Sequence, residues 1–562
     1  MNNVIDRFGA RTLKLRKRRA KIEVEDNGIF VTKLVKWSWV ILLIAAFLQA
    51  LIFSTNENFI AIGCILIAWT ITSKVFLQRD VLNSYPLSAF LVIGFASTQL
   101  YFPILFTLLE GKPVVYNLEL PLQVFFHSTA ALFVLVIAHY VYRLLPINTY
   151  RGSNSLLSRA GFFEPPSELQ LWSMGAIGLA ANIYVFFFSP TIATEVAGNV
   201  SEKAIFALLP FGYAPYFIPF TSLYGSEKSI TRRTISFLIA FTILLFIISM
   251  ARNSRGAFMI GFTSVGFSYL LGLLVGVFKS PSISFKTLIF SVVGFWLITG
   301  PMADLGTAMV IVRSQREDIS KSELIDLTLD AFSNKKAISL RRLNDNEAQG
   351  DWDERYLDNI FTARFANLKF NDASLVQAAK IGDNNPSLQK FSIDYVWGAL
   401  PTPILKVLHP SVDKEMVYSV SFGDYIYSLA GAGKSAYGGF RTGHFAGTGM
   451  GAFGLWYLLI LGIGIIPIYL LFDKLVFIKK QYGLSISGIR PQLCFSVCGL
   501  LALTSIFQFL PTESVAGLGT FLLRGWFQMI LLYFFMYQFT RVACKYIPAL
   551  FSNSNLNKNV YG

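Results

Sequence analysis

The chain has 562 residues, of which 54% are hydrophobic, 15% are aromatic and 14% are charged, and its mean hydropathy is +0.53. Soluble domains carry about 25% charged residues, so this composition excludes an ordinary soluble enzyme or binding domain and indicates a membrane protein. The formal net charge of +15 would suit a nucleic-acid-binding protein, but the basic residues cluster beside apolar runs, as membrane topology signals do.

Apolar runs of about 20 residues recur along the chain, and each can cross a hydrocarbon core of about 30 Å as a helix. Helices are expected because every backbone polar group in lipid needs a partner within the protein. We therefore expect an all-α polytopic membrane protein with about twelve transmembrane helices. The ninth span is expected to break at Gly300 and Pro301. The expected spans are 37–54, 58–77, 86–109, 121–144, 168–189, 204–224, 234–251, 256–278, 284–312, 453–472, 491–511 and 517–540.

Basic residues mark one side of these spans. The tail 1–36 is strongly basic, and later clusters stand beside the ends of further spans. With twelve spans and the N-terminus inside, every cluster falls on the cytoplasmic side, which is the positive-inside pattern. We therefore expect both tails, 1–36 and 541–562, in the cytoplasm, with anionic lipid and not nucleic acid as the partner of these charges. The later clusters are Arg143/Arg151/Arg159, Lys228/Arg232/Arg233, Lys279/Lys286, Lys474/Lys479/Lys480/Arg490 and Arg541/Lys545.

One segment, 313–452, is polar, charged and aromatic, and it separates the apolar regions 37–312 and 453–540. The charge pattern places this segment outside the cytoplasm, as a large periplasmic loop, on the same face as the short turn 252–255. A membrane enzyme would handle a substrate too polar for lipid in such a segment. We expect it to act as a lid over a substrate held at the membrane surface.

Local patterns predict structure within the polar segment. Apolar residues at helical spacing predict short amphipathic helices over 322–335 and 355–370, the second continued by 372–381. The stretch 394–403 is apolar and interrupted by proline, which suits a position at the membrane interface. Glycine is frequent from 430 to 454, and it permits unusual backbone and close approach to a bulky partner.

Two arginines, Arg252 and Arg255, stand in a tight turn on the side of the membrane where short loops avoid positive charge. Guanidinium groups form fork-shaped sites for phosphate oxygens, so this turn is a candidate phosphate-binding site. The alternative is that both side chains contact lipid headgroups.

Further cations lie in the polar segment and in the last span. Arg364 and Arg441 are candidates for the same anion, with a structural salt bridge as the alternative for Arg364. Arg524 lies in the outer half of the last span, where an arginine marks a functional site or pairs with an acid such as Glu513. His444 follows Arg441 by three residues and is a candidate proton acceptor or hydrogen-bond donor, or else an ordinary loop histidine.

Three aromatic residues, Tyr395, Trp397 and Tyr437, are candidates for contacts with sugar faces, with aromatic packing as the alternative. The chain contains no Asp-x-Asp, P-loop, His-Glu-x-x-His or Gly-x-Ser-x-Gly signature. Metal dependence and nucleotide hydrolysis are therefore not expected, and no cofactor is implied.

Several of these features occur together in one known family. They are the many spans, the single large late segment, the turn Asn253-Ser254-Arg255-Gly256, the Pro401/Pro403 stretch followed by Leu408-His409-Pro410, and the glycine-rich Arg441–Gly454 run. In this combination the chain resembles the Wzy-type O-antigen and exopolysaccharide repeat-unit polymerases, members of the O-antigen polymerase/ligase superfamily.

The resemblance implies a GT-C-like architecture and a glycosyltransferase of the bacterial inner membrane. Such an enzyme joins undecaprenyl-diphosphate-linked repeat units at the outer leaflet, with the lipid diphosphate as leaving group and without metal. It implies a lipid-linked donor and a lipid-linked acceptor as substrates, and a chain-length regulator and a flippase as partners. The diphosphate would be bound by Arg252, Arg255, Arg364 and Arg524, and Arg255, Arg441 and His444 would be catalytic.

Three rival interpretations remain. A flippase or other transporter of lipid-linked oligosaccharide would be expected to show two similar halves, and no internal repeat stands out here. A polyprenyl-phosphate-sugar glycosyltransferase would be expected to carry an acidic motif in the first outer loop, which here holds Asn56, Glu57 and Asn58. The sister activity, ligation of O-antigen to a lipid core, fits the same residues as polymerisation.

Overall fold

The computed structural model describes most of the chain, and helices make up most of what it describes. The described residues are 29–145, 155–187, 200–227, 230–251, 255–279, 289, 292–294, 296–312, 321–344, 352–409, 411–481, 490–510 and 513–556.

Nine helices within these described ranges are long and apolar enough to cross a membrane. The protein is thus a helical polytopic membrane protein, as its composition predicts. The count of twelve spans stays a prediction. The nine helices are Ile29–Ile52, Asn56–Val75, Pro86–Leu109, Pro121–Leu144, Ala204–Tyr224, Arg232–Met250, Val292–Ile311, Trp456–Asp473 and Ala516–Tyr546.

Three expected spans are not among the nine. Helix α8 (Glu168–Phe187) covers the expected range 168–189, and α11 (Arg255–Leu274) is apolar over the shorter stretch Met259–Leu274. The prediction of one continuous span over 491–511 is wrong, because this stretch divides into a strand and two short helices.

The all-α class agrees with the mostly helical structure, and one short β-hairpin stands among the helices. Strand β2 (Arg490–Phe495) pairs antiparallel with β1 (Val476–Gln481), so that Val476 faces Phe495 and Gln481 faces Arg490. The side chain of Ser496 then accepts a hydrogen bond from the backbone N–H of Cys498 and begins α23 (Val497–Leu501). Helix α24 (Leu503–Phe507) follows directly. A short β-hairpin therefore replaces the first part of the predicted helix.

Two long apolar helices contain a π-helical turn beside a proline. The third span consists of α4 (Pro86–Ala96), the π turn η1 (Ser97–Tyr101) and α5 (Phe102–Leu109), and it is the most deeply buried of the nine. The helix near Pro301 widens in the same way at η3 (Ile298–Met302) before α13 (Ala303–Ile311). Proline removes a helical hydrogen bond, so the expected break appears as a local widening and the helix continues.

The polar segment folds into short helices. A helix is present over the expected 322–335, but the expected helix over 355–370 is wrong, since most of that stretch is irregular. The helical elements are α14 (Lys321–Ser333), α15 (Lys335–Asn344), η5 (Thr362–Phe365), α16 (Leu368–Ile381), α17 (Pro386–Trp397), α18 (Thr402–Leu408), α19 (Lys414–Ser419), α20 (Phe422–Tyr427), η6 (Ser428–Ala432), η7 (Gly433–Ala436) and α21 (Phe445–Phe453).

Part of the polar segment belongs to the core of the bundle. Ten of the 14 residues of α16 are buried, and α16 packs against α21 and against α6 (Pro121–Leu144). The glycines of α21 allow this, because a Cβ on Gly447 would stand 2.3 Å from Ser374 and one on Gly449 would stand 2.6 Å from Tyr457. The expected close approach at these glycines is confirmed.

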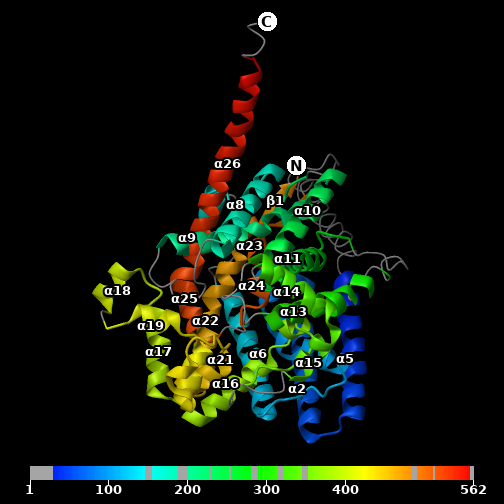
Figure 1. Ribbon diagram of the computed structural model, residues 1–562, viewed down its shortest axis with the longest axis vertical. Helices are drawn as coiled ribbons and strands as arrows, with labels where there is room; N and C mark the ends of the chain where they lie inside the picture. The colour runs from blue at the N-terminus through cyan, green and yellow to red at the C-terminus, as the bar shows by residue number, and fades with distance from the viewer. Residues whose placement is uncertain are drawn as a thin grey trace, which may run out of the picture.

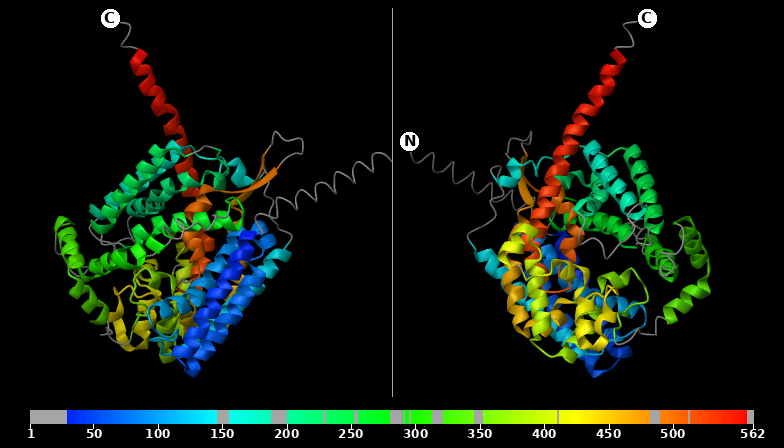
Figure 2. Two further views of the ribbon diagram at one scale, coloured as in Figure 1. Left: turned by 90° about the vertical axis from the view of Figure 1, so that its right-hand side faces the viewer. Right: turned by 60° about the vertical axis from the view of Figure 1, so that its left-hand side comes forward.

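The elements are arranged along the long axis of the molecule. Helix α26 (Trp526–Leu556) projects alone beyond the rest of the protein at the C-terminal end (Figure 1). The β-hairpin extends from the body toward that same end (Figure 2). Helices α16, α17 and α21 gather at the opposite end (Figure 1). This opposite end is where the polar segment meets the membrane-spanning helices.

Candidate functional site

An irregular stretch, 352–367, crosses the membrane-spanning helices and is here called the strap. Glu110 fixes it by accepting hydrogen bonds from the backbone N–H groups of Asp358 and Asn359, at 2.8 and 2.9 Å. The side-chain amide of Asn359 donates to the carbonyl of Thr299 at 2.8 Å. The N–H of Asn367 donates to the carbonyl of Thr98 at 3.1 Å. The strap is therefore anchored on both π-helical turns and on the loop after α5.

Three neighbouring cavities lie along the strap. The apolar cavity is narrow, lies between α10 (Arg232–Ala251) and α13, and is lined by Phe361. The middle cavity lies between α11, α24 and the strap and shares Phe361 with the first. The outer cavity lies beside α13 and α15 and shares Ile360 with the middle one. The apolar cavity and the middle cavity thus adjoin an outer cavity with a more polar wall.

Arg364 lies where the apolar walls meet the strap. Its neighbours in the middle cavity include Met259, Ile260 and Thr263 from α11, and the side chain of Gln508 donates to the Arg364 carbonyl at 3.3 Å. A guanidinium beside an apolar cavity suits a ligand with an anionic head and an apolar tail. Of the predicted diphosphate ligands, Arg364 is the one whose described side chain lines these cavities.

Two arginines of the outer cavity, Arg341 and Arg355, are not among the residues that the sequence predicts for the site. They line its wall with Tyr116 and Asp358. Arg355 also forms an ion pair with Asp353, with 3.2 Å between Nε and Oδ1, and Asp358 pairs with Lys112 at 2.7 Å. No local pattern distinguished these arginines from solvated ones, because their proximity depends on how α15 and the strap fold against α13.

The turn that contains Arg252 and Arg255 is described in part. Arg252 lies outside the described residues, and Arg255 is the first residue of α11, with its side chain outside the description. The backbone of Arg255 stands about one helical turn before Met259, which lines the middle cavity. The predicted site at this turn therefore starts the helix that forms one wall of the middle cavity.

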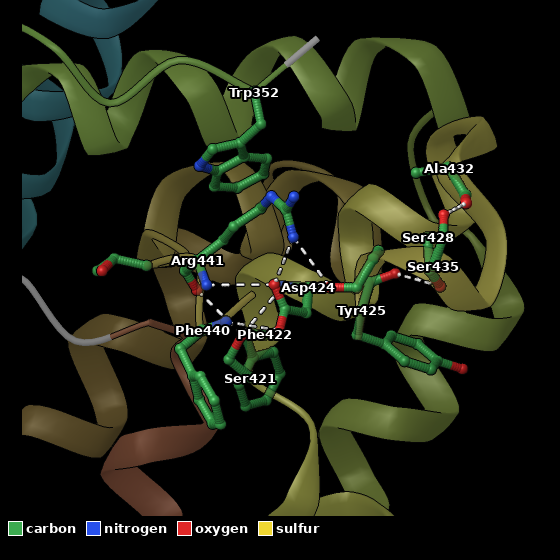
Figure 3. A network of polar contacts seen from close by, with 12 residues as sticks. Trp352, Ser421, Phe422, Asp424, Tyr425, Ser428, Ala432, Ser435, Phe440 and Arg441 are labelled. Atoms are coloured by element: carbon green, nitrogen blue, oxygen red, sulfur yellow. Dashed lines mark hydrogen bonds and ion pairs between the residues drawn. The ribbon is translucent and has the colours of Figure 1, made fainter. Parts of the chain in front are cut away.

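Arg441 lies in a closed network around Asp424, which is almost fully buried (Figure 3). Its Nη1 donates to Asp424 Oδ1 at 3.0 Å and to the carbonyl of Ala436 at 2.9 Å. The guanidinium carbon lies 4.6 Å from the centre of the Tyr427 ring, and the indole of Trp352 lies beside the guanidinium in Figure 3. The N–H groups of Phe440 and Arg441 complete the coordination of the carboxylate. In this geometry Arg441 forms a buried structural ion pair with Asp424.

His444 is fully buried at the start of α21. Its Nδ1 accepts from the N–H of Ala446 at 3.4 Å, and its Nε2 lies 3.3 Å from the side-chain nitrogen of Gln99 in η1. Burial, together with the nearby His127, lowers the pKa of His444 to about 3. The ring is therefore neutral at physiological pH, caps a helix and lines none of the three cavities. Its predicted role as a base is untested, and this position does not favour it.

Arg524 lies in a π turn, η8 (Phe521–Gly525), of the last span, and its Nε donates to Gln528 at 3.2 Å. Glu513, its expected partner, accepts instead from the N–H of Phe422 at 2.9 Å. Within the part of the chain that the structure describes, Arg524 and Glu513 form no ion pair with each other. Neither residue lines one of the three cavities.

The three predicted sugar-contact aromatics pack against other side chains. The Tyr395 ring lies 4.8 Å from the ring of Tyr418, and the Trp397 ring lies 5.5 Å from the ring of His409. The hydroxyl of Tyr437 accepts from Ser428 at 3.4 Å. The contacts of Tyr395 and Trp397 correspond to the packing alternative, whereas Tyr437 is held by a hydrogen bond. Tyr116 lines the outer cavity, and Lys112 Nζ lies 4.6 Å from the centre of its ring.

No protein-family model, no curated protein and no solved structure matches this chain. Among the described residues, no group of three or more histidine, cysteine, aspartate and glutamate side chains is placed to hold a metal ion. The interpretation of the site therefore depends on the chemistry of the strap and its cavities.

Proposed function

We propose that the protein is a glycosyltransferase that joins undecaprenyl-diphosphate-linked oligosaccharide repeat units into a surface polysaccharide at the outer leaflet of the bacterial inner membrane. The observation that carries this proposal is the position of Arg364 in a cavity walled by apolar side chains of α11. A polyprenyl diphosphate has the matching character, because it joins a doubly charged head to a long apolar tail.

The proposal also places the apolar tail of the lipid carrier. The middle cavity shares Phe361 with the apolar cavity, whose walls include Phe246 and Met250 of α10 and Met309 of α13. These helices belong to apolar elements that face lipid elsewhere on their surface. In this proposal the carrier chain lies against apolar side chains of α10 and α13 and presents its diphosphate to Arg364.

The outer cavity receives the saccharide. Its wall combines Tyr116, whose ring contacts Lys112, with the polar groups of Arg341, Arg355 and Asp358, and the hydroxyls of a saccharide bind to hydrogen-bonding groups of this kind. The acceptor hydroxyl attacks the anomeric carbon, the bond from that carbon to the phosphate oxygen breaks, and the diphosphate leaves with the electron pair. Arginines stabilise the charge that develops on the diphosphate. Asp358 supplies a carboxylate to accept the hydroxyl proton.

The test is deletion of the gene and complementation with Arg364→Ala, with sizing of the surface polysaccharide. Loss of a transition-state charge contact lowers rates by about 10²–10³-fold, so long chains should disappear while single repeat units remain. The matched control is Lys434→Ala, which removes an exposed cation of the same segment and should leave long chains intact. Membrane levels of both variants are measured in parallel.

Other outcomes of the deletion identify the rival functions. Full-length attached chains in the deletion strain would refute the polymerase proposal. Long polymer that stays unattached would identify a ligase. Loss of all repeat units from the outer leaflet, with lipid-linked units retained on the cytoplasmic side, would identify a flippase.

A further inference from the structure

Helix α18 (Thr402–Leu408) exposes apolar side chains in an otherwise polar part of the chain. Ile404 is 47% exposed, Val407 is 81% exposed and Leu408 is 58% exposed, while Leu405 is buried and holds the helix to the protein. Figure 1 shows α18 extending sideways from the body of the molecule. Three large apolar side chains on one seven-residue helix form an unusual surface unless something covers them.

The position of α18 relative to the membrane is set by the elements on either side of it in the chain. At the C-terminal end of α17, Val396 packs against α25 (Ala516–Thr520), where a Cβ on Gly519 would meet its side chain at 2.9 Å. Arg524 acts electrostatically on Tyr395 in α17 and on Tyr418 in α19. Arg524 lies about two helical turns into the apolar helix that begins at Ala516. The pair α17 and α19 therefore lies along the outer turns of a membrane-spanning helix.

The surface beside the contact between α17 and α25 faces lipid. On the last span Leu523, Phe527 and Leu531 are exposed apolar side chains of an element long enough to cross the bilayer. Leu405 of α18 belongs to the same buried cluster as Ala516 at the start of the last span, so α18 is attached to the protein beside that span. What covers the apolar surface of that span in a membrane is hydrocarbon.

The residues that flank the apolar face are those of a membrane interface. Trp397 stands just before α18 and packs on His409 just after it, and tryptophan is enriched at the level of the headgroups. Lys406 is exposed on the helix itself and can reach lipid phosphate while its stem stays in apolar surroundings. An apolar face with a basic flank is the composition of a helix that lies in the membrane interface.

We propose that α18 inserts into the leaflet on the side of the polar segment and anchors that segment to the bilayer. Its occupant is the acyl region of the lipid, with Ile404, Val407 and Leu408 below the headgroups and Lys406 at the phosphates. This anchor is independent of the reaction proposed above. The anchor holds α17, α18 and α19 at a fixed depth in the membrane. The strap remains in contact with the membrane-spanning helices.

The test uses the purified full-length protein in phospholipid nanodiscs. A nitroxide is attached to Val407→Cys in a background with the four native cysteines replaced, and its accessibility to oxygen and to a water-soluble nickel chelate is measured by electron paramagnetic resonance. The ratio of oxygen to nickel accessibility should be several-fold higher at Val407→Cys than at the aqueous control Lys434→Cys, which lies in the exposed part of the same segment.

Two results would overturn the proposal. Nickel accessibility at Val407→Cys equal to that at Lys434→Cys would place α18 in water. Exclusion of both reagents would place the side chain against protein, as in a contact with a second copy. A second variant, Ile404→Ser with Val407→Ser and Leu408→Ser, should expose a label at Ser411→Cys to nickel if lipid holds the helix, and should leave that label unchanged if it does not.

Discussion

The polar segment contains arginines in two contrasting settings. Arg441 belongs to the part that is built into the bundle, where a buried carboxylate, a carbonyl and an aromatic ring surround its guanidinium. Arg364 belongs to the strap, where its side chain lines the middle cavity. The two residues have the same chemistry and lie in the same segment. The difference teaches that residue type alone does not set the surroundings of an arginine, because one guanidinium is enclosed in a buried network and the other lies on a cavity wall.

The same contrast extends to the neighbouring charges. In α16 the buried Lys369 and Asp372 form an ion pair at 2.7 Å, with side chains 3% and 0% exposed. Asp372 also accepts from the N–H groups of Glu119 and Leu120 just before α6 begins. On the strap side, Arg341 and Arg355 line a cavity. The predictions below test whether the first group acts on stability and the second on activity.

The largest expected effect belongs to the buried pair in α16. Asp372→Ala leaves the Lys369 ammonium buried and removes two hydrogen bonds at the start of α6, so it should destabilise the protein by about 3–5 kcal/mol. Thermal unfolding in detergent measures the change. The double variant Lys369→Met with Asp372→Leu should recover much of the loss, and an unchanged unfolding temperature for Asp372→Ala would contradict a structural role.

The next effect concerns activity at the outer cavity. Arg341→Ala combined with Arg355→Ala should lower chain extension by about 10–100-fold, which corresponds to about 1.4–2.7 kcal/mol, because two cations of the wall are lost. The unfolding temperature should change little, since neither residue is buried in the core. Normal chain lengths from this variant would remove the outer cavity from the proposed site.

A smaller effect should show whether Arg441 is a structural residue or a catalytic one. Asp424→Ala and Arg441→Met should each lower stability, and the two changes should couple by about 1–3 kcal/mol in a double-mutant cycle. If Arg441 acts on substrate, Arg441→Met should abolish chain extension at temperatures where the variant is still folded. If it is structural, chain extension should follow the amount of folded protein.

The smallest effect concerns pH. Burial raises the pKa of Glu513, and the nearby Asp424 and Glu354 act in the same direction, against a hydrogen bond from Phe422. The folded state therefore favours the protonated acid, and stability should fall as pH rises through this raised pKa. Glu513→Gln should raise the unfolding temperature at neutral pH and leave it unchanged in acid. Glu415→Gln, at an exposed position, is the control and should show no such difference.

Much of the fold was predictable because it depends on local composition. The helices over 86–109 and 121–144 have the predicted bounds, since an apolar run in lipid must satisfy its own backbone by forming a helix. The distortion at Pro301 was predictable for the same local reason. The stretch 491–511 was not, because its first residues pair with a partner strand, β1, which is a non-local choice.

The candidate site was predictable only in part. Arg364 was among the predicted ligands and lines a cavity, but His444 and Arg441 had the same polar surroundings in the sequence and are enclosed by Gln99 and Asp424 in the fold. Charge and residue type do not reveal whether a partner folds beside a group. Arg341 and Tyr116 were missed for the converse reason, since segments far apart in the chain bring them to one cavity.

The sequence by itself determined that this is a helical membrane protein with one large polar segment, because hydrophobic length and charge distribution act locally against the bilayer. The tertiary structure decided where that segment lies. It places α16 and α21 inside the bundle and leaves the strap over the cavities. It also decided which arginines are enclosed and which line a cavity, because the surroundings of a charge depend on the neighbours that packing brings to it.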